Sequence, residues 1–160
     1  MDFNTADICD DNMKENLQIL APNFKNYGGK KKCRGEVITI KLDKSNWGLI
    51  DLLKSGNGEG KIIVVDNAEY FFGVVGDKLM ALAKENNWAG FVINGFVRDI
   101  EITKDIDVLL YALGTCPLRN FEKTKSELGA QLSFGGVTFN NKNYLYADDD
   151  GILLCQKNLL

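Results

Sequence analysis

The sequence predicts an α/β protein built around a mixed sheet. Two continuous apolar runs, over residues 61–65 and 90–94, flank a helical pattern that begins at Asp77. Such runs are typical of strands covered on both faces, and the strand-helix-strand order predicts a right-handed parallel crossover. Short apolar runs separated by polar turns close the chain and predict an antiparallel meander. A length of 160 residues suits one domain, spanning residues 1–160.

Two helices and one strand are predicted before the first apolar run. Residues 5–11 form the first helix, with Thr5 as a candidate cap and acids that favour the helix dipole. Residues 33–42 alternate in polarity as a strand does, and residues 47–53 suit a short amphipathic helix. Residues 24–32 are expected to form a turn followed by the basic run Lys30-Lys31-Lys32, for which a solvated loop is favoured over an anion or protein contact.

After the first apolar run, a loop with Gly73 and Gly76 leads into a helix over residues 77–87. A further strand is expected over residues 105–112, followed by a polar surface excursion over residues 121–131. The predicted meander comprises residues 132–134, 137–139, 144–147 and 152–155. The acidic turn at residues 148–151 lacks the spacing of an EF-hand, which favours a hairpin turn over a calcium loop.

The composition is that of an ordinary globular chain, with 45% apolar and 26% charged residues. A net charge of −3 gives no sign of nucleic-acid binding. No apolar segment approaches the roughly 20 residues that span a bilayer, and the N-terminus lacks the pattern of a signal peptide. The four cysteines are scattered, which favours reduced, packed thiols and a cytoplasmic location.

The sequence contains no histidine. This absence excludes Ser-His and Cys-His nucleophilic pairs, imidazole bases and histidine-ligated metals. Catalysis by this chain must therefore rest on carboxylates, Lys, Arg, Tyr, backbone amides or a hard cation held by oxygen atoms.

Two features are expected at one edge of the sheet. The helix that starts after Gly76 offers the backbone amides of Asp77, Lys78 and Leu79 to an anion. Arg98 and Asp99 follow the second apolar run, where open α/β sheets place ligands. Each feature alone also suits a simple turn, cap or surface ion pair, and only their convergence favours a carboxylate and cation site. Asp66 ends the first run at the same edge and is a secondary candidate.

Segments along nearly the whole chain resemble the RraA-like family, which includes regulators of ribonuclease E activity and class II 4-hydroxy-4-methyl-2-oxoglutarate aldolases. The resemblance is carried by TADICD at residues 5–10, NYGG at 26–29, GKIIVVD at 60–66, NWAGFVINGFVR at 87–98, FGGVTF at 134–139, YLYAD at 144–148 and Gly151-Ile152. It implies a swivelling β/β/α domain and a ring-shaped homotrimer with clefts between subunits.

In the aldolase branch, the resemblance implies a role for each candidate residue. Substrate binding falls to Gly76, Asp77, Lys78, Leu79 and Arg98, metal binding to Asp99, and catalysis to Arg98. The cofactor would be Mg²⁺ or Mn²⁺, and the substrate a small 2-oxo acid. The implied reaction forms pyruvate through an enolate stabilised by the metal and Arg98, which also implies decarboxylation of oxaloacetate.

The regulator branch is the alternative, in which the protein acts by binding ribonuclease E. Asp99 is present in this chain and the two loop glycines are retained, which is consistent with a metal site. Two positions depart from the aldolase pattern: Ile102 replaces an acid three residues after Asp99, and Asp77 stands where glutamate is more usual. The sequence therefore combines features of both branches.

Overall fold

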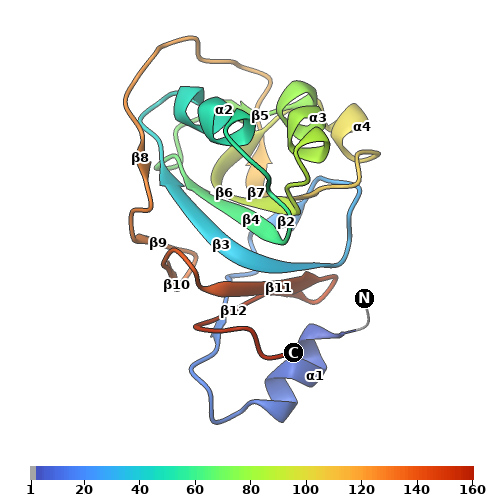
Figure 1. The fold of residues 1–160 in the computed structure, drawn as a ribbon. Helices are drawn as coiled ribbons and strands as arrows, with labels where there is room; N and C mark the ends of the chain where they lie inside the picture. The colour runs from blue at the N-terminus through green and yellow to red at the C-terminus, as the bar shows by residue number, and fades with distance from the viewer. Residues whose placement is uncertain (1–2) are drawn as a thin grey trace.

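The computed structural model describes residues 3–160, and a curled mixed sheet forms its centre (Figure 1). The strand order along the sheet is β1-β12-β11-β3-β4-β6-β7-β2, with β5 pairing β6 and β8 pairing β3. The helices are α1 (Thr5–Asp11), α2 (Trp47–Lys54), α3 (Asp77–Glu85) and α4 (Ile100–Thr103). The strands are β1 (Gln18–Ile19), β2 (Lys25–Asn26), β3 (Cys33–Lys41), β4 (Lys61–Asp66), β5 (Gly73–Val75), β6 (Gly90–Val97), β7 (Leu109–Thr115), β8 (Glu127–Leu128), β9 (Leu132–Phe134), β10 (Val137–Phe139), β11 (Tyr144–Asp148) and β12 (Gly151–Cys155).

The two continuous apolar runs form the parallel centre of the sheet, as predicted. Strand β4 pairs in parallel with both β3 and β6, and β6 pairs in parallel with β7. Helices α2 and α3 cover one face of these strands (Figure 1). Leu49 and Leu53 of α2 and Met80 of α3 are fully buried in the core beneath them. Parallel strands with both faces covered explain why these runs carry no polar alternation.

The opposite face of the central strands packs on the curled part of the sheet. Ile62, Val64 and Val92 point into a second core, where they meet Leu145 of β11 and Leu154 of β12. Burying the second face in this way removes further apolar surface from water, and such burial stabilises the fold by about 25 cal/mol per Å². Within residues 3–160, no helix is long and apolar enough to cross a membrane.

The predicted continuous C-terminal meander is wrong in one respect. Strands β9 and β10 form one hairpin in a sheet of their own, whereas β11 and β12 form a second hairpin in the main sheet. Residues 140–143 separate the two hairpins and redirect the chain. Asn141 accepts hydrogen bonds from the N–H and the hydroxyl of Thr39, and these bonds dock the connection on β3. Strand β11 consequently pairs with β3 and not with β10.

Two other boundaries differ from the predictions. The strand expected over residues 105–112 begins only at Leu109, because α4 and a tight turn occupy the preceding residues. The loop expected around Gly73 contains a short strand, β5, that pairs with the end of β6. The acidic segment 148–151 is a hairpin turn, as predicted, in which Asp148 lies opposite Gly151.

Within the described chain, no cysteine is paired in a disulfide. Cys33, Cys116 and Cys155 are buried. Burial raises the pKa of Cys33 to about 12 and that of Cys155 to about 11. These two thiols therefore stay protonated at neutral pH and act as small apolar side chains.

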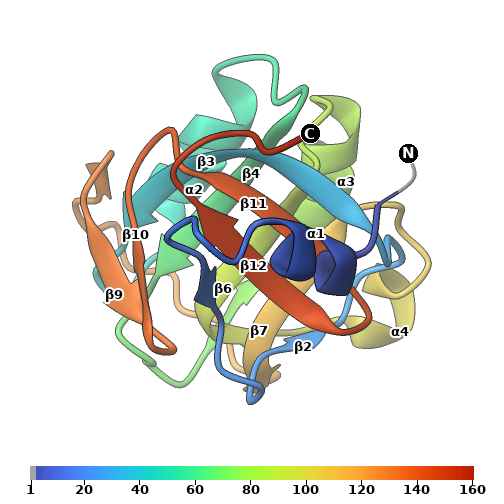
Figure 2. The ribbon, with the colours of Figure 1, turned by 90° about the horizontal axis from the view of Figure 1, so that it is seen from below.

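Helix α1 lies across β11 and β12 at the lower side of the molecule (Figure 2). Its anchor is Asp148, which accepts hydrogen bonds from the N–H and the hydroxyl of Thr5, both at 2.7 Å. Burial alone would raise the pKa of Asp148. The hydrogen bonds from Thr5 and from the Asp150 N–H, together with the charge of Lys32, outweigh burial and hold the pKa of this carboxyl below its ordinary value of 3.8.

Replacing Asp148 with asparagine is expected to lower the free energy of unfolding by about 1–3 kcal/mol, because hydrogen bonds to a charged group are lost. A lowered pKa means that the stabilisation is present above the ordinary pKa and disappears as the pH falls through the folded value. Urea unfolding at neutral and acid pH measures both effects. Asp149→Asn is the matched control, because Asp149 is its exposed neighbour. Equal stability of the two variants at neutral pH contradicts the anchoring role.

Candidate functional site

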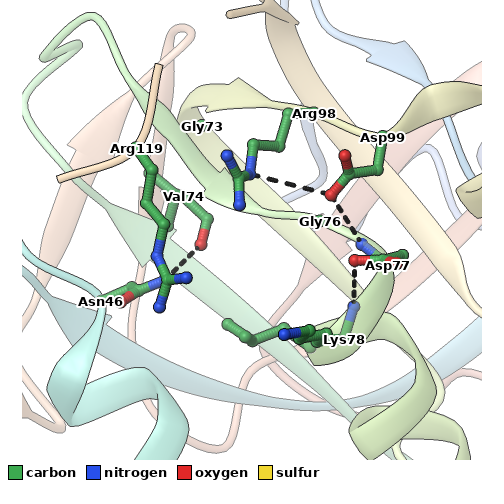
Figure 3. Close-up of a pocket in the computed structure, with 10 residues that line it drawn as sticks. Asn46, Gly73, Val74, Gly76, Asp77, Lys78, Arg98, Asp99 and Arg119 are labelled. Atoms are coloured by element: carbon green, nitrogen blue, oxygen red, sulfur yellow. Dashed lines mark hydrogen bonds and ion pairs between the residues drawn. The ribbon is translucent and has the colours of Figure 1, made fainter. Parts of the chain in front are cut away.

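A pocket opens where β5, α3, the end of β6 and the loop after β7 meet (Figure 3). Its lining residues are Asn46, Gly73, Val74, Gly76, Asp77, Lys78, Leu79, Arg98, Asp99 and Arg119. The structure thus brings together the primary candidates from the sequence, which are Gly76, Asp77, Lys78, Leu79, Arg98 and Asp99. The free space measures about 40 Å³, far below the roughly 300–1,000 Å³ that is usual for small-molecule sites. On one chain the site is therefore shallow.

The arginine and the aspartate reach the pocket from the end of β6. The Arg98 N–H donates to the carbonyl of Val75 at 3.0 Å, which ties the end of β6 to β5. Arg98 Nη1 donates to the carbonyl of Pro117 at 3.3 Å, and Arg98 Nε lies 3.7 Å from Asp99 Oδ2. Both side chains are about one-third exposed, so each remains accessible to a ligand.

Asp99 holds a left-handed backbone conformation, with φ of 59° and ψ of 35°. Few residues other than glycine adopt this region, although Asp and Asn tolerate it. Such conformations cost free energy and concentrate at functional sites. Here the conformation turns the chain from β6 into α4, and the Asp99 carboxylate points toward α3 (Figure 3).

The N-terminus of α3 already holds carboxylates. The Asp77 N–H donates to Asp99 Oδ2 at 3.3 Å, and the Lys78 N–H donates to the Asp77 carboxylate at 2.8 Å. Free amides at a helix start attract anions, and this helix start binds side-chain carboxylates in the same way. An incoming carboxylate at the Asp77 amide would have to replace Asp99 there.

Gly73 and Gly76 lack side chains, and this leaves the space that Arg98 and Asp99 occupy. A Cβ atom on Gly76 would lie 2.3 Å from Asp99 Oδ2, and a Cβ atom on Gly73 would lie 2.8 Å from Arg98 Cδ. The backbone of Gly76 is extended, with φ of −135°. Glycine is therefore required at position 76 for space and not for conformational freedom.

Gly76→Ala is expected to displace the Asp99 carboxylate and to lower any activity of this pocket by about 10²-fold, since misplacement of a catalytic group by about 1 Å has that effect. Gly56→Ala is the matched control, because a Cβ atom there meets nothing within 4 Å. Activity assays on both proteins, with thermal unfolding as a check on folding, measure the difference. Equal activity of the two variants would show that the position of Asp99 is unimportant.

The polar side chains of Asn46 and Arg119 line the pocket and were not predicted from the sequence. Asn46 Nδ2 donates to the Val74 carbonyl at 2.9 Å, which fixes the wall of the pocket. Arg119 is exposed and stacks on Phe121, with 4.4 Å between the guanidinium carbon and the ring centroid. Both lie opposite Asp99 (Figure 3). Neither stands in a motif, and only the path of the loop after β7 brings Arg119 to the pocket.

The secondary candidate Asp66 lies at the predicted edge but does not line the pocket. Asp66 Oδ1 accepts hydrogen bonds from Asn94 Nδ2 and from the Ala68 N–H, both at 2.9 Å. These partners give Asp66 a structural role in joining β4 to β6. Ile102, which stands where the aldolase pattern has an acid, is 52% exposed on α4 and does not line the pocket. The nearest acid, Glu101, pairs with Lys104 at 2.8 Å and does not line the pocket either.

The donor set of the pocket fits a hard cation that keeps most of its water. Within residues 3–160, no group of three or more His, Cys, Asp or Glu side chains is placed to hold a metal ion. Asp77 and Asp99 are the carboxylates that line the pocket. Mg²⁺ commonly binds through one or two carboxylates and retains several waters. Asp99, accessible beside the pocket, meets this requirement.

Comparisons with known proteins identify the family and the fold of this chain. The RraA-like family model (Aldolase/RraA) matches residues 5–154. Two relatives share the name "Putative 4-hydroxy-4-methyl-2-oxoglutarate aldolase". The protein of Aromatoleum aromaticum is 35% identical over 100% of both chains. The protein of Laribacter hongkongensis is 38% identical over 100% of both chains.

Solved structures show the same fold. The RNA-processing inhibitor RraA from Thermus thermophilus superimposes with a TM-score of 0.93 and 29% identity, covering 100% of this chain and 96% of the other. A Geobacillus kaustophilus protein described as S-adenosylmethionine: 2-dimethylmenaquinone methyltransferase gives a TM-score of 0.92 and 32% identity, covering 98% and 97%. With a family match over nearly its whole length and close relatives of equal length, this chain belongs to the RraA-like family.

Proposed function

We propose that this protein is a divalent-metal-dependent carbon–carbon lyase that releases pyruvate from 4-hydroxy-4-methyl-2-oxoglutarate and from oxaloacetate. The observation that carries the proposal is the meeting of Arg98 and Asp99 with the N-terminus of α3 in one pocket. The aldolase name of relatives 35–38% identical over the whole chain supports it.

The proposed reaction moves one electron pair toward the 2-oxo group. In oxaloacetate, the bond between C3 and C4 breaks, CO₂ leaves, and the bonding pair forms the enolate of pyruvate. In the aldol substrate, the C4 hydroxyl passes its proton to a water molecule as the C3–C4 bond breaks, giving pyruvate and the same enolate. Protonation at C3 then completes the second product.

Each pocket residue has a role in that reaction. The α3 amides of Asp77 and Lys78 would bind the C1 carboxylate in place of the carboxylates that they now hold. The Arg98 guanidinium would donate to the developing enolate oxygen and stabilise its charge. A divalent cation held through Asp99 and water would supply Lewis-acid polarisation of the 2-oxo group. Asp99, once released from the Asp77 amide, would be available for that cation.

A homotrimer forms part of the same proposal. Several exposed apolar side chains stand within a few residues, along the chain, of residues that line the pocket: Trp47, Tyr70, Phe71, Ile100, Ile102, Leu118 and Phe121. Contiguous exposed apolar surface commonly marks a protein interface. A neighbouring subunit on this surface would deepen the 40 Å³ pocket into a cleft that encloses a 2-oxo acid. We also propose a cytoplasmic location, in keeping with the free thiols.

A pyruvate-release assay tests the proposal directly. Purified protein is incubated with oxaloacetate or 4-hydroxy-4-methyl-2-oxoglutarate, with Mg²⁺ or Mn²⁺, and pyruvate is followed through a coupled dehydrogenase. Release above the metal-catalysed background, abolished by a chelator, supports the lyase. Background rates with both substrates and both metals reject it.

Arg119 is expected to select substrates with a second carboxylate. Its cation lies across the pocket from Asp99 (Figure 3), where a distal carboxylate would extend. Arg119→Gln should raise KM for oxaloacetate about tenfold, since a charge-assisted hydrogen bond is lost. The exchange of the methyl protons of pyruvate, which has no second carboxylate, should change little. Equal effects on both reactions contradict a role in selection.

Regulation of a ribonuclease is the second candidate function. The similarity to the RNA-processing inhibitor RraA, with a TM-score of 0.93, favours it, as does the lack of a pocket acid at Ile102. In this case purified protein should slow RNA cleavage by ribonuclease E, and Asp99→Asn should slow it equally. Unchanged cleavage with excess protein contradicts this function.

A further inference from the structure

A second and larger cavity lies at the other end of α3. It measures about 630 Å³ and is lined by Lys30, Lys32, Cys33, Arg34, Glu59, Gly60, Lys84, Asn87, Trp88, Ala89 and Asp107. None of these residues lines the candidate active site. The cavity is formed at the amino ends of β3, β4, β6 and β7, whereas the first pocket lies beyond the carboxyl end of β6.

The lining of this cavity is basic although the whole chain is acidic. Lys30, Lys32 and Arg34 come from the end of the loop before β3 and from the start of β3, and all three line the cavity. Lys84, in the last turn of α3, adds a fourth cation. The lining also contains two carboxylates, those of Glu59 and Asp107. A surplus of cations in a chain of net charge −3 marks the cavity as a local site for anions.

The four basic side chains differ in the contacts that they make within the protein. Lys30 lies 3.9 Å from Asp107, and Lys32 donates to Asn4 Oδ1 at 3.1 Å. Arg34 and Lys84 form no ion pair with any residue from 3 to 160. The half-buried Arg34 offers a planar fork that suits two oxygens of one phosphate, and Lys84 offers a point charge.

We propose that this cavity binds a small phosphorylated metabolite. Its volume falls in the range of roughly 300–1,000 Å³ that is usual for small-molecule sites. Arg34 and Lys84 bind the phosphate, and the remaining volume holds the body of the ligand beside the residues around Trp88. The cavity is separate from the proposed lyase site, because the two pockets share no residue.

Fluorescence of Trp88 provides the test, since the chain has only one other tryptophan, Trp47, which does not line the cavity. The probes are adenosine 5′-monophosphate, ribose 5-phosphate and inorganic phosphate, with adenosine and ribose as uncharged counterparts. We expect saturable binding of the phosphorylated probes that weakens with added salt, and no binding of the uncharged ones. Equal binding of adenosine and its monophosphate overturns a phosphate site, as does the absence of binding by every probe at millimolar concentration.

A pair of double variants ties the binding to this cavity. Arg34→Gln with Lys84→Gln should weaken binding about tenfold or more, because two charged contacts are lost. Lys41→Gln with Lys54→Gln is the matched control. It removes the same charge from the other end of β3 and from the last turn of α2. Equal weakening by both pairs indicates a general charge effect and rejects the site. Tight binding of an RNA oligonucleotide without binding of the small probes also rejects it. Circular dichroism confirms that each variant is folded.

Discussion

Asp99→Asn is expected to lower kcat for pyruvate release by about 10²–10³-fold, the usual effect of removing one preorganised electrostatic group. Asparagine tolerates the left-handed backbone of this position, so the turn from β6 into α4 should persist. The variant also removes the anionic ligand that a divalent cation needs. Mn²⁺ binding, followed by electron paramagnetic resonance, should weaken together with kcat.

Asp66→Asn is the matched control for this variant. Asp66 is a carboxylate at the same edge of the sheet, but it bonds Asn94 and Ala68 and does not line the pocket. Its replacement should leave Mn²⁺ binding unchanged and lower stability only slightly. If Asp99→Asn retains full activity and full Mn²⁺ affinity, Asp99 is not the metal ligand and the proposed chemistry fails.

The position of the candidate site could be predicted because its residues lie next to the ends of apolar runs in the sequence. The burial of β4 and β6 fixes where both strands end, and therefore fixes where Arg98 and Asp99 emerge beside the start of α3. The helix start was also visible from Gly76. No local pattern could reveal that the Asp99 carboxylate accepts a hydrogen bond from the Asp77 N–H, because the two residues are 22 positions apart.

The parts that escaped prediction depend on long-range contacts. Arg119 reaches the pocket in a loop held by distant bonds, such as the one from Asn120 Nδ2 to the Lys44 carbonyl. The split of the C-terminal strands depends on Asn141, which bonds Thr39 of β3. Single polar side chains such as these carry no periodicity, so the sequence predicts the hairpins but not their partners.

Arg98→Lys is expected to lower kcat/KM for pyruvate release by about 10²-fold even though the charge is kept. Lysine lacks the planar fork that binds a carbonyl oxygen and a second acceptor together. In the structure, Arg98 uses Nη1 for the Pro117 carbonyl and Nε toward Asp99, and a single ammonium cannot hold both. Because the side chain is about one-third exposed, the free energy of unfolding should change by less than about 1 kcal/mol.

Arg34→Lys is the same replacement at the half-buried arginine of the second cavity, and it should leave pyruvate release unchanged. Both variants keep the net charge of the protein. A loss of activity in Arg98→Lys alone would therefore come from the shape of the guanidinium group at position 98 and not from a change of charge. If Arg98→Lys matches the parent protein in kcat/KM, a point charge suffices at this position. Stabilisation of the enolate would then rest on the cation at Asp99 and on the α3 amides, and Arg98 would serve only to hold the loop at Pro117.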